Sequence, residues 1–248
     1  MPKITEREIV EYIEQHIESF HSRRLESLTK LKLRNVITRK NPYLFRAKNI
    51  VSGPELVRSF LDAYLSSQEE GIFGTFLEGL ARFVCQRAYG GHKSSAEGID
   101  LEFTKKGVTY IVSIKSGPNW GNAGQIRRMI DNFRKAKRIL GTNIGRQNVV
   151  AVNGCCYGRT RVADQGDYLK LCGQEFWEFI SGNWNLYIDI IEPLGHRAKE
   201  RNEAFQVEYA KVITRFTGEF IADFCTPDGT IIWKKVLKLN SGANAVKR

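Results

Sequence analysis

The stretch of sequence that decides the fold reads GIDLEFTKKGVTYIVSIK, residues 98–115. Apolar and polar residues alternate on both sides of Lys106-Gly107, which is the pattern of two half-buried strands joined by a tight turn. Glycine supplies the positive φ that a two-residue hairpin turn requires. With this turn, three apolar pairs face one another: Leu101 with Val112, Phe103 with Tyr110, and Ile99 with Ile114. The stretch therefore predicts an antiparallel hairpin with one apolar core face.

The opposite face of this hairpin pairs Asp100 with Ser113 and places Lys115 one pleat further along the same side. A slip of one residue would bury the charged residues and expose the apolar set, so the register is well specified. A carboxylate is a hard oxygen ligand that suits Mg²⁺. An adjacent ammonium would stabilise the negative charge of a phosphodiester transition state or orient the attacking water. The backbone carbonyl of Ile114 would complete the metal shell.

The charge of the chain is concentrated in two segments. The total is 38 − 27 = +11. Residues 23–48 hold nine basic residues against Glu26, a local +8, and residues 103–163 hold twelve against Asp131, a local +11, so the remainder carries −8. Clustered positive charge attracts polyanions and steers them to one face. The pattern favours nucleic acid as the partner.

Several classes of protein are excluded. An apolar content of 42% excludes overall disorder. No apolar run approaches the roughly 18 residues that a membrane helix needs, and residues 1–6 contain no apolar signal-peptide core. The five cysteines form no CxxC metal pair or disulfide framework, and no Walker A motif is present. We expect a cytoplasmic protein that contacts no membrane and uses no nucleotide cofactor.

The rest of the chain predicts an α/β or α+β core, with a central mixed sheet flanked by helices. Its expected elements are helices over residues 5–20, 52–67, 73–88, 122–140, 174–180 and 192–224, strands over 148–152 and 168–172, and a closing segment over 231–239. We interpret residues 1–248 as a single elaborated domain. It comprises a basic helical N-terminal region (1–70), a core that carries the hairpin site (71–182) and a mostly helical C-terminal region (183–248).

The hairpin, with Glu97-Gly98-Ile99-Asp100 before it and Ile111–Lys115 as its second strand, resembles the PD-(D/E)xK nuclease superfamily. An upstream helix carries Glu78, as is often seen there. Further segments are similar to those of type II restriction endonucleases and extend the likeness over roughly residues 73–239: Ser113–Gly117 followed by Trp120, Gly173–Trp177, and Asp228–Thr230 with Trp233. The resemblance implies Mg²⁺-dependent cleavage of double-stranded DNA at a short specific site, by a homodimer in a prokaryotic cytoplasm.

The sequence departs from the superfamily pattern at two positions. Ile99 stands where proline usually precedes the aspartate, and Ser113 stands where an acidic residue usually precedes the lysine by two. Asp100 and Lys115 match, and Ser113 becomes a hydrogen-bonding group behind them. The second acidic metal ligand then has three main candidates: Glu78, which we favour, Glu102 and Asp131.

Polar and basic residues after the hairpin are candidates for DNA contacts. They are Asn119, Trp120 and Asn122 in a Gly/Asn-rich loop, Gln125, Arg127 and Arg128 in the helix that follows, and Arg159 and Arg161 after the strand over 148–152. Such side chains reach phosphates or base edges. Two rival functions stay open: a structure-selective repair or junction-resolving nuclease on the same core, and a DNA-binding module that lost catalysis with the acidic residue at Ser113.

Overall fold

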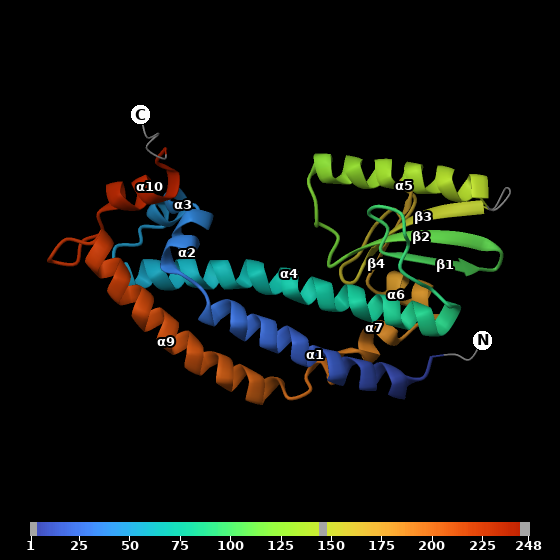
Figure 1. The fold of residues 1–248 in the computed structure, drawn as a ribbon, viewed down its shortest axis with the longest axis horizontal. Coiled ribbons are helices and arrows are strands. Elements are labelled where there is room, and N and C mark those ends of the chain that lie inside the picture. Colours follow the sequence, from blue (N-terminus) through green and yellow to red (C-terminus); the bar gives the residue numbers. More distant parts are fainter. Residues whose placement is uncertain (1–3, 144–147, 244–248) are drawn as a thin grey trace. The chain divides into compact units, whose positions relative to one another are not determined.

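The computed structural model describes residues 4–143 and 148–243 (Figure 1). Met1–Lys3 of the N-terminal segment and Arg146 of the second basic segment lie outside the described residues. The chain divides into two compact units. The sheet unit comprises Met1–Glu18 and Phe73–His196, and the helical unit comprises Ser19–Ile72 and Arg197–Arg248. The interpretation of all 248 residues as a single nuclease domain stays a prediction.

The sheet unit contains a four-stranded sheet in the order β1-β2-β3-β4, which is mixed as expected. Its strands are β1 (Leu101–Lys105), β2 (Val108–Lys115), β3 (Asn148–Cys155) and β4 (Leu169–Cys172). β1 and β2 are antiparallel, whereas β3 lies parallel to β2 and β4 parallel to β3. The predicted pairs Leu101–Val112 and Phe103–Tyr110 are confirmed. The predicted pair of Ile99 with Ile114 is wrong, because the pairing ends at Leu101 and the two isoleucines lie in different core clusters. Lys106 and Gly107 both have positive φ, 52° and 76°, as the turn requires.

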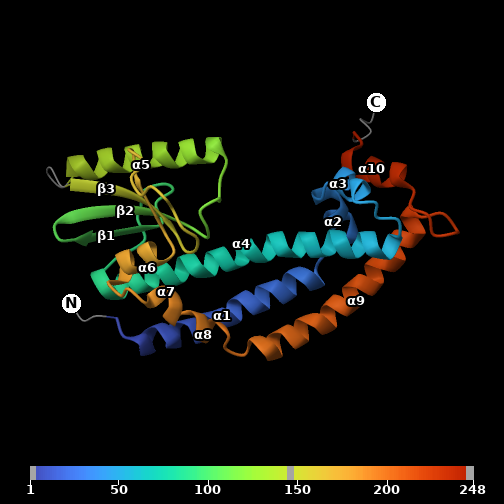
Figure 2. The same cartoon turned by 180° about the vertical axis from the view of Figure 1, so that it is seen from behind.

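Helices cover both faces of this sheet (Figures 1 and 2). Helix α5 (Ala123–Asn143) connects the parallel strands β2 and β3 and lies on one face, while α4 and α6 (Gln174–Ser181) lie on the other. The prediction of one core face is therefore incomplete: Leu101 and Val112 pack towards α4 and α6, but Ile99 and Ile111 pack with Met129 and Phe133 of α5. A strand inside a sheet with a crossover helix is buried on both faces, which adds a second apolar layer.

Helix α4 (Gly53–Tyr89) is one continuous helix of 37 residues. The prediction of separate helices over 52–67 and 73–88 is wrong. Gly71 and Gly74 lie within this helix, where each costs only about 1 kcal/mol, and burial of the flanking residues offsets that cost. Leu61 is fully buried in the core of the helical unit and Leu80 in that of the sheet unit. The predicted start is close, because Ser52 Oγ accepts a hydrogen bond from the Glu55 N–H at 3.4 Å.

The other helices of the N-terminal region are α1 (Glu6–Thr29), α2 (Leu33–Arg39) and α3 (Pro42–Ala47). Helix α1 is longer than the predicted 5–20. Asn41 and Pro42 begin α3, and the Asn41 side chain accepts hydrogen bonds from the N–H groups of Tyr43 and Leu44.

The C-terminal region is more broken than predicted. Instead of one helix over 192–224, the chain forms α7 (Leu186–Asp189), α8 (Ile191–Leu194) and α9 (Ala198–Phe224), followed by α10 (Trp233–Ser241). The interruption falls at Arg197, whose φ of 52° is left-handed and therefore incompatible with a continuous helix. All five cysteines are buried free thiols, in line with a core role. Among the described residues, no helix combines the length and apolar content needed to cross a bilayer.

Candidate active site

Asp100 enters the sheet directly before β1. Gly98 brings it there with a φ of 74°, and a Cβ at Gly98 would lie 2.2 Å from Asn132 Nδ2 of α5. Only glycine accommodates both that backbone conformation and that close approach. The Asp100 N–H then donates at 2.9 Å to the carbonyl of Val112, the residue that pairs with Leu101, so the hairpin is offset by one residue at Asp100. The backbone of Asp100 is thereby fixed against β2.

The Asp100 carboxylate lies against the end of β2. Its Oδ2 accepts a hydrogen bond from the Ile114 N–H at 2.7 Å and a longer one from Ser113 Oγ at 3.4 Å. Lys115 Nζ lies 3.9 Å from the same oxygen. The two side chains retain 24% and 28% of their exposure, so both are partly desolvated yet reachable. The structure thus brings together the acid and the amine that the hairpin register predicts.

The carbonyl of Ile114 points to the same edge of β2 as the Asp100 carboxylate. The Lys115 carbonyl accepts from the Cys156 N–H at 2.9 Å, on the β3 side. Neighbouring residues in a strand direct their carbonyls to opposite edges, and the Ile114 N–H already points to Asp100. Two oxygen donors of the predicted metal shell therefore face one side.

Glu78 of α4 lies within the electrostatic range of this pair. Partial burial raises the pKa of Glu78, and the negative charge of Asp100 raises that pKa further. The positive charges of Arg82, Lys115 and Lys93 lower it. Arg82 Nη2 is 3.7 Å from Glu78 Oε1, and the Glu78 side chain retains 33% of its exposure. A second carboxylate, half-buried in the field of Asp100, is thus present on a different element.

The competing carboxylates have partners elsewhere. Glu102 Oε2 accepts a hydrogen bond from Ser94 Oγ at 2.9 Å. Asp131 lies 3.9 Å from Arg134 on the exposed side of α5. Glu97 pairs with Arg128 at 3.2 Å. Glu78 also has a partner in Arg82, but the charge of Asp100 raises the pKa of Glu78, and this proximity favours Glu78 as the acid that accompanies Asp100.

The donor set fits a magnesium ion. Across residues 4–143 and 148–243, no three His, Cys, Asp or Glu side chains gather into a metal cluster. Mg²⁺ does not need such a cluster, because it is usually held by one or two carboxylates, water and substrate phosphate. Asp100, Glu78 and the Ile114 carbonyl supply oxygen donors of that kind.

Trp120 supports Lys115 from the following loop. The Lys115 ammonium lies 5.0 Å from the centroid of the Trp120 ring, within the range of a cation–π contact. The indole Nε1–H donates to Asn153 Oδ1 at 3.2 Å, and Asn153 Nδ2 donates to the Ser113 carbonyl at 3.3 Å. The sequence interpretation missed Asn153. Its signal was an amide in an otherwise apolar strand, where burial requires a partner.

The remaining polar residues of the loop cap α5. Asn122 N–H donates to Gln125 Oε1 at 2.9 Å, and Gln125 N–H donates to Asn122 Oδ1 at 3.1 Å. This reciprocal pattern is a capping box. It accounts for both residue types without DNA, so their predicted DNA contacts, and that of the exposed Asn119, stay predictions.

The predicted arginine contacts fall on exposed positions. Arg127 and Arg128 lie in the first two turns of α5, and Arg159 and Arg161 follow β3. Arg128 is paired with Glu97. Arg127, Arg159 and Arg161 form no ion pair within the described part of the chain. Unneutralised guanidinium groups near the hairpin suit phosphate oxygens.

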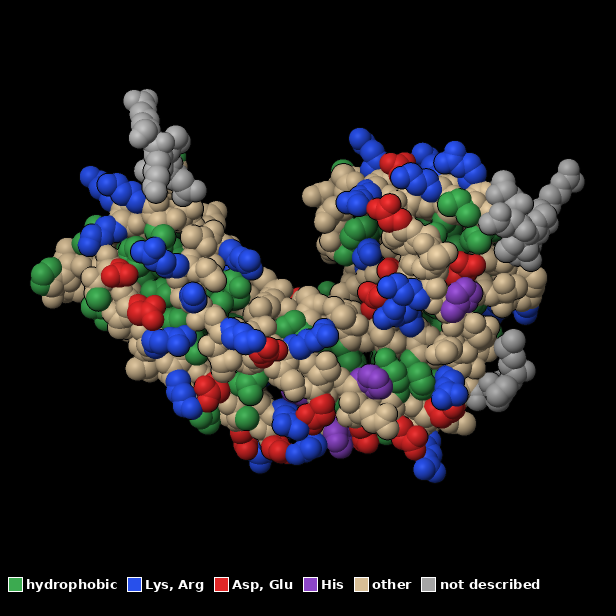
Figure 3. All heavy atoms as spheres, viewed as in Figure 1, with side chains coloured by type: hydrophobic (Ala, Val, Ile, Leu, Met, Phe, Trp, Pro, Cys, Tyr) green, Lys and Arg blue, Asp and Glu red, His purple; other side chains and the backbone are tan. Residues whose placement is uncertain are grey.

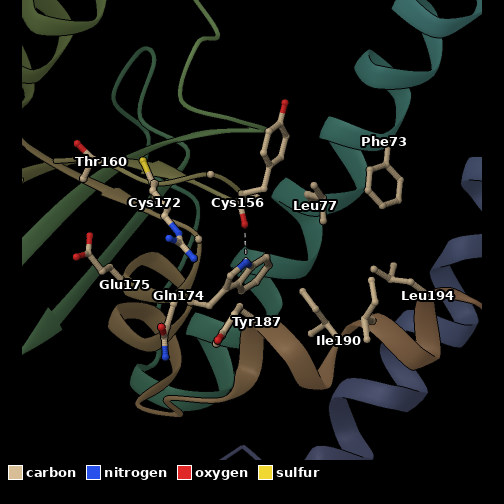
Figure 4. A pocket seen from close by; sticks show the side chains of 16 residues that line it. Phe73, Leu77, Cys156, Thr160, Cys172, Gln174, Glu175, Tyr187, Ile190 and Leu194 are labelled. Atoms are coloured by element: carbon tan, nitrogen blue, oxygen red, sulfur yellow. Dashed lines mark hydrogen bonds between the residues drawn. The ribbon is translucent and has the colours of Figure 1, made fainter.

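A cavity of about 500 Å³ opens beside the segments that follow β3 and β4 (Figure 4). Its walls are mostly apolar, with Phe73 and Leu77 from α4 and Ile190 and Leu194 from the C-terminal side. The Trp177 indole N–H donates to the Cys156 carbonyl at 2.8 Å and closes one wall. Asp100, Lys115 and Glu78 do not line the cavity. The residues of the candidate active site therefore lie outside this cavity.

Comparison with known proteins gives one family. The family model described as type II restriction endonuclease EcoO109I matches residues 7–202. No curated protein matches the chain. The matched range contains the hairpin, Glu78 and the basic helix α5, so it covers every element of the site described above.

Proposed function

Because the chain belongs to the type II restriction endonuclease EcoO109I family, we propose that it cleaves both strands of duplex DNA at a short specific site. The proposal includes Mg²⁺ as cofactor and a homodimer as the active form, in a prokaryotic cytoplasm. The observation that carries it is the Asp100–Lys115 pair, 3.9 Å apart at the end of β2. A dimer suits the proposal because two-fold symmetry in the protein mirrors that of a palindromic site.

Asp100, Glu78 and the Ile114 carbonyl would hold Mg²⁺ in this proposal. When bound, the ion would polarise the scissile phosphate and lower the pKa of a water molecule. Ser113 leaves β2 without the usual acidic residue, and Glu78 from α4 would replace it. The Ile114 N–H and Ser113 Oγ orient the Asp100 carboxylate, so its geometry does not depend on the ion.

Lys115 would act on the transition state. Its ammonium is fixed between the Asp100 carboxylate and the Trp120 ring. A cation held in place stabilises charge that develops on a phosphate oxygen without reorganisation at the moment of reaction. Arg127, Arg128, Arg159 and Arg161 would place the duplex by contacts to phosphates or base edges.

The direct test is digestion of a long DNA of known sequence with Mg²⁺, followed by mapping of the ends. Discrete fragments with one common end sequence support the proposal, and EDTA should abolish them. Cleavage confined to branched DNA would instead identify a junction-resolving or repair enzyme. Duplex binding without nicking over hours would identify a non-catalytic module. Light scattering of the free protein tests the dimer.

A further inference from the structure

A separate basic surface lies in the helical unit. It is built by α2, α3 and α10, because α10 packs against both of the other helices. The Asn240 side-chain amide of α10 donates to the Ile37 carbonyl at 2.6 Å and to the Lys40 carbonyl at 2.9 Å. These bonds fix two segments that lie about 200 residues apart in the sequence. Charges on the three helices therefore act as one group.

The two segments that form these three helices contain cations and no acid. No Asp or Glu occurs in residues 27–54 or in residues 229–243. We call the nine cations on or beside the three helices the basic helical surface: Lys32, Arg34, Arg39, Lys40, Arg46, Lys48, Lys234, Lys235 and Lys238. All but the partly buried Lys40 are exposed. Figure 3 shows Lys and Arg side chains gathered over this part of the unit.

The charges of the basic helical surface are ordered but not neutralised. Arg46 lies over the Trp233 ring at 5.7 Å and Lys48 over the Phe45 ring at 5.6 Å. Within the described residues, none of the nine forms an ion pair. Elsewhere in the same unit, cations do have acidic partners, as Lys211 has in Glu208 at 2.6 Å. The absence of acidic partners is thus a property of this surface and not of the whole unit.

Such a surface fits a polyanion. Unneutralised like charges repel one another, and a bound polyanion relieves that repulsion. A second copy of the same surface would add positive charge across a two-fold axis, so it is a poor occupant. Tyr43 and Leu44, exposed by 63% and 50% beside these cations, would offer apolar contact to sugars or bases.

We propose that the basic helical surface binds the phosphate backbone of duplex DNA and adds affinity that the hairpin site does not supply. This inference rests on the proposed function for its choice of DNA. Contacts to phosphate carry little sequence information. The surface would therefore strengthen binding to all sequences about equally and would make that binding sensitive to salt.

The test measures the salt dependence of binding by the full chain. The anisotropy of a labelled duplex of random sequence is followed in EDTA over a series of salt concentrations. Lys234→Gln/Lys238→Gln should lower the slope of log affinity against log salt by up to about 1.8, because each lost phosphate contact removes about 0.9. Adding Lys32→Gln and Lys48→Gln should lower it by up to about 3.6.

A matched control removes two paired cations of the same unit, Lys30 and Lys211, by Lys30→Gln/Lys211→Gln. Its slope should stay near that of the wild type, because Glu26 and Glu208 already neutralise these charges. Thermal unfolding establishes that every variant folds. Loss of dimer in the Lys234→Gln/Lys238→Gln variant would identify a subunit interface and overturn the proposal. Equal slopes for that variant and the wild type would overturn it too.

The failure of this inference is distinguishable from the failure of the proposed function. If the wild type cuts DNA at specific sites but the slopes coincide, only the basic helical surface is misassigned. If the wild type cuts no DNA while the slope falls as expected, the surface still binds DNA and the nuclease proposal fails. Vesicles with anionic lipid provide a parallel probe, and a loss confined to vesicle binding would overturn the assignment to DNA.

Discussion

Two regions of the sheet unit use the same kinds of charge in opposite ways. On α5, Arg134 Nη1 lies 3.9 Å from Asp131 and its Nη2 lies 3.0 Å from Asp167, with 63% of the arginine side chain exposed. At the end of β2, Lys115 lies at the same 3.9 Å from Asp100, but the two side chains are only 28% and 24% exposed. Distance alone does not separate the two pairs.

The difference lies in what holds each acid. Asp100 is fixed by the Ile114 N–H and Ser113 Oγ on a central sheet, whereas Asp131 stands on a helix surface where water and salt screen it. Exposed ion pairs contribute about 0–1 kcal/mol. The comparison teaches that the hairpin charges are suited to chemistry and the α5 charges to association. Substitutions in the two regions should therefore change different measured quantities.

The largest expected effect is on cleavage by Asp100→Ala and Lys115→Ala. Removing Asp100 should lower the cleavage rate at least about 10³-fold, because both the metal ligand and the partner of Lys115 are lost. Lys115→Ala should lower it about 10²–10³-fold, as expected for one fixed group at the transition state. Single-turnover rates measure both effects, and duplex affinity in EDTA should change only a few-fold. If both variants cut at the wild-type rate, the site is misassigned.

Glu78→Gln should have the next largest effect. It should lower the cleavage rate while it raises the stability of the fold. Cleavage should fall about 10–100-fold, at a higher Mg²⁺ requirement, as is typical when a group that tunes a metal site is lost. Glu102→Gln and Asp131→Asn are the matched controls, because both acids have partners elsewhere. If one of these controls loses cleavage and Glu78→Gln does not, that control has removed the second ligand.

The pKa of Glu78 gives the same variant a second signature. Since this pKa is raised on folding, the folded chain binds the proton more tightly than the unfolded chain. The ionised form therefore costs stability above the folded pKa. Glu78→Gln should unfold at a higher temperature than the wild type near pH 7, and the gap should close as the pH falls through the raised pKa towards 4.5. Thermal unfolding across pH checks the sign.

Substitutions of Trp120 test whether its ring assists Lys115 in cleavage. Trp120→Ala removes the ring and should slow single-turnover cleavage about 5–30-fold, in line with a cation–π contact of about 1–2 kcal/mol. Trp120→Phe keeps a ring near Lys115 and should recover most of that rate. Both variants leave Asn153 Oδ1 without the indole N–H, so each should lose about 1–3 kcal/mol of stability in denaturant unfolding. Equal rates for the two variants would show that the ring does not assist Lys115.

The sequence predicts the hairpin site well because its information is local. Alternation and one glycine at the turn determine the pairing of residues 101–105 with 108–112, and Asp100 and Lys115 lie 3.9 Å apart at the end of that pairing. The prediction divided helix α4 into two helices, because the burial of Leu61 and Leu80 that keeps the helix intact depends on distant segments.

Contacts between distant residues were beyond the sequence. Glu78 comes within electrostatic range of Asp100 only because α4 packs on the sheet. Asn153 and Trp120, 33 residues apart, are joined by one hydrogen bond across a loop. The left-handed backbone at Arg197 could not be predicted from the residue type, because arginine rarely adopts this conformation. Periodicity predicts elements, whereas these features arise from tertiary packing.

The smallest expected effects distinguish two neighbours on α5. Arg127 forms no ion pair in the described part of the chain, whereas Arg128 Nη2 is paired with Glu97 at 3.2 Å. Arg127→Gln should lower the salt slope of duplex binding by about 0.9 if it contacts one phosphate, and Arg128→Gln should lower it less, because Glu97 already offsets its charge. Neither variant should change the single-turnover rate at saturating protein. A fall in that rate, with the slope unchanged, would place chemistry on α5 and would remove the distinction between the helix and the hairpin.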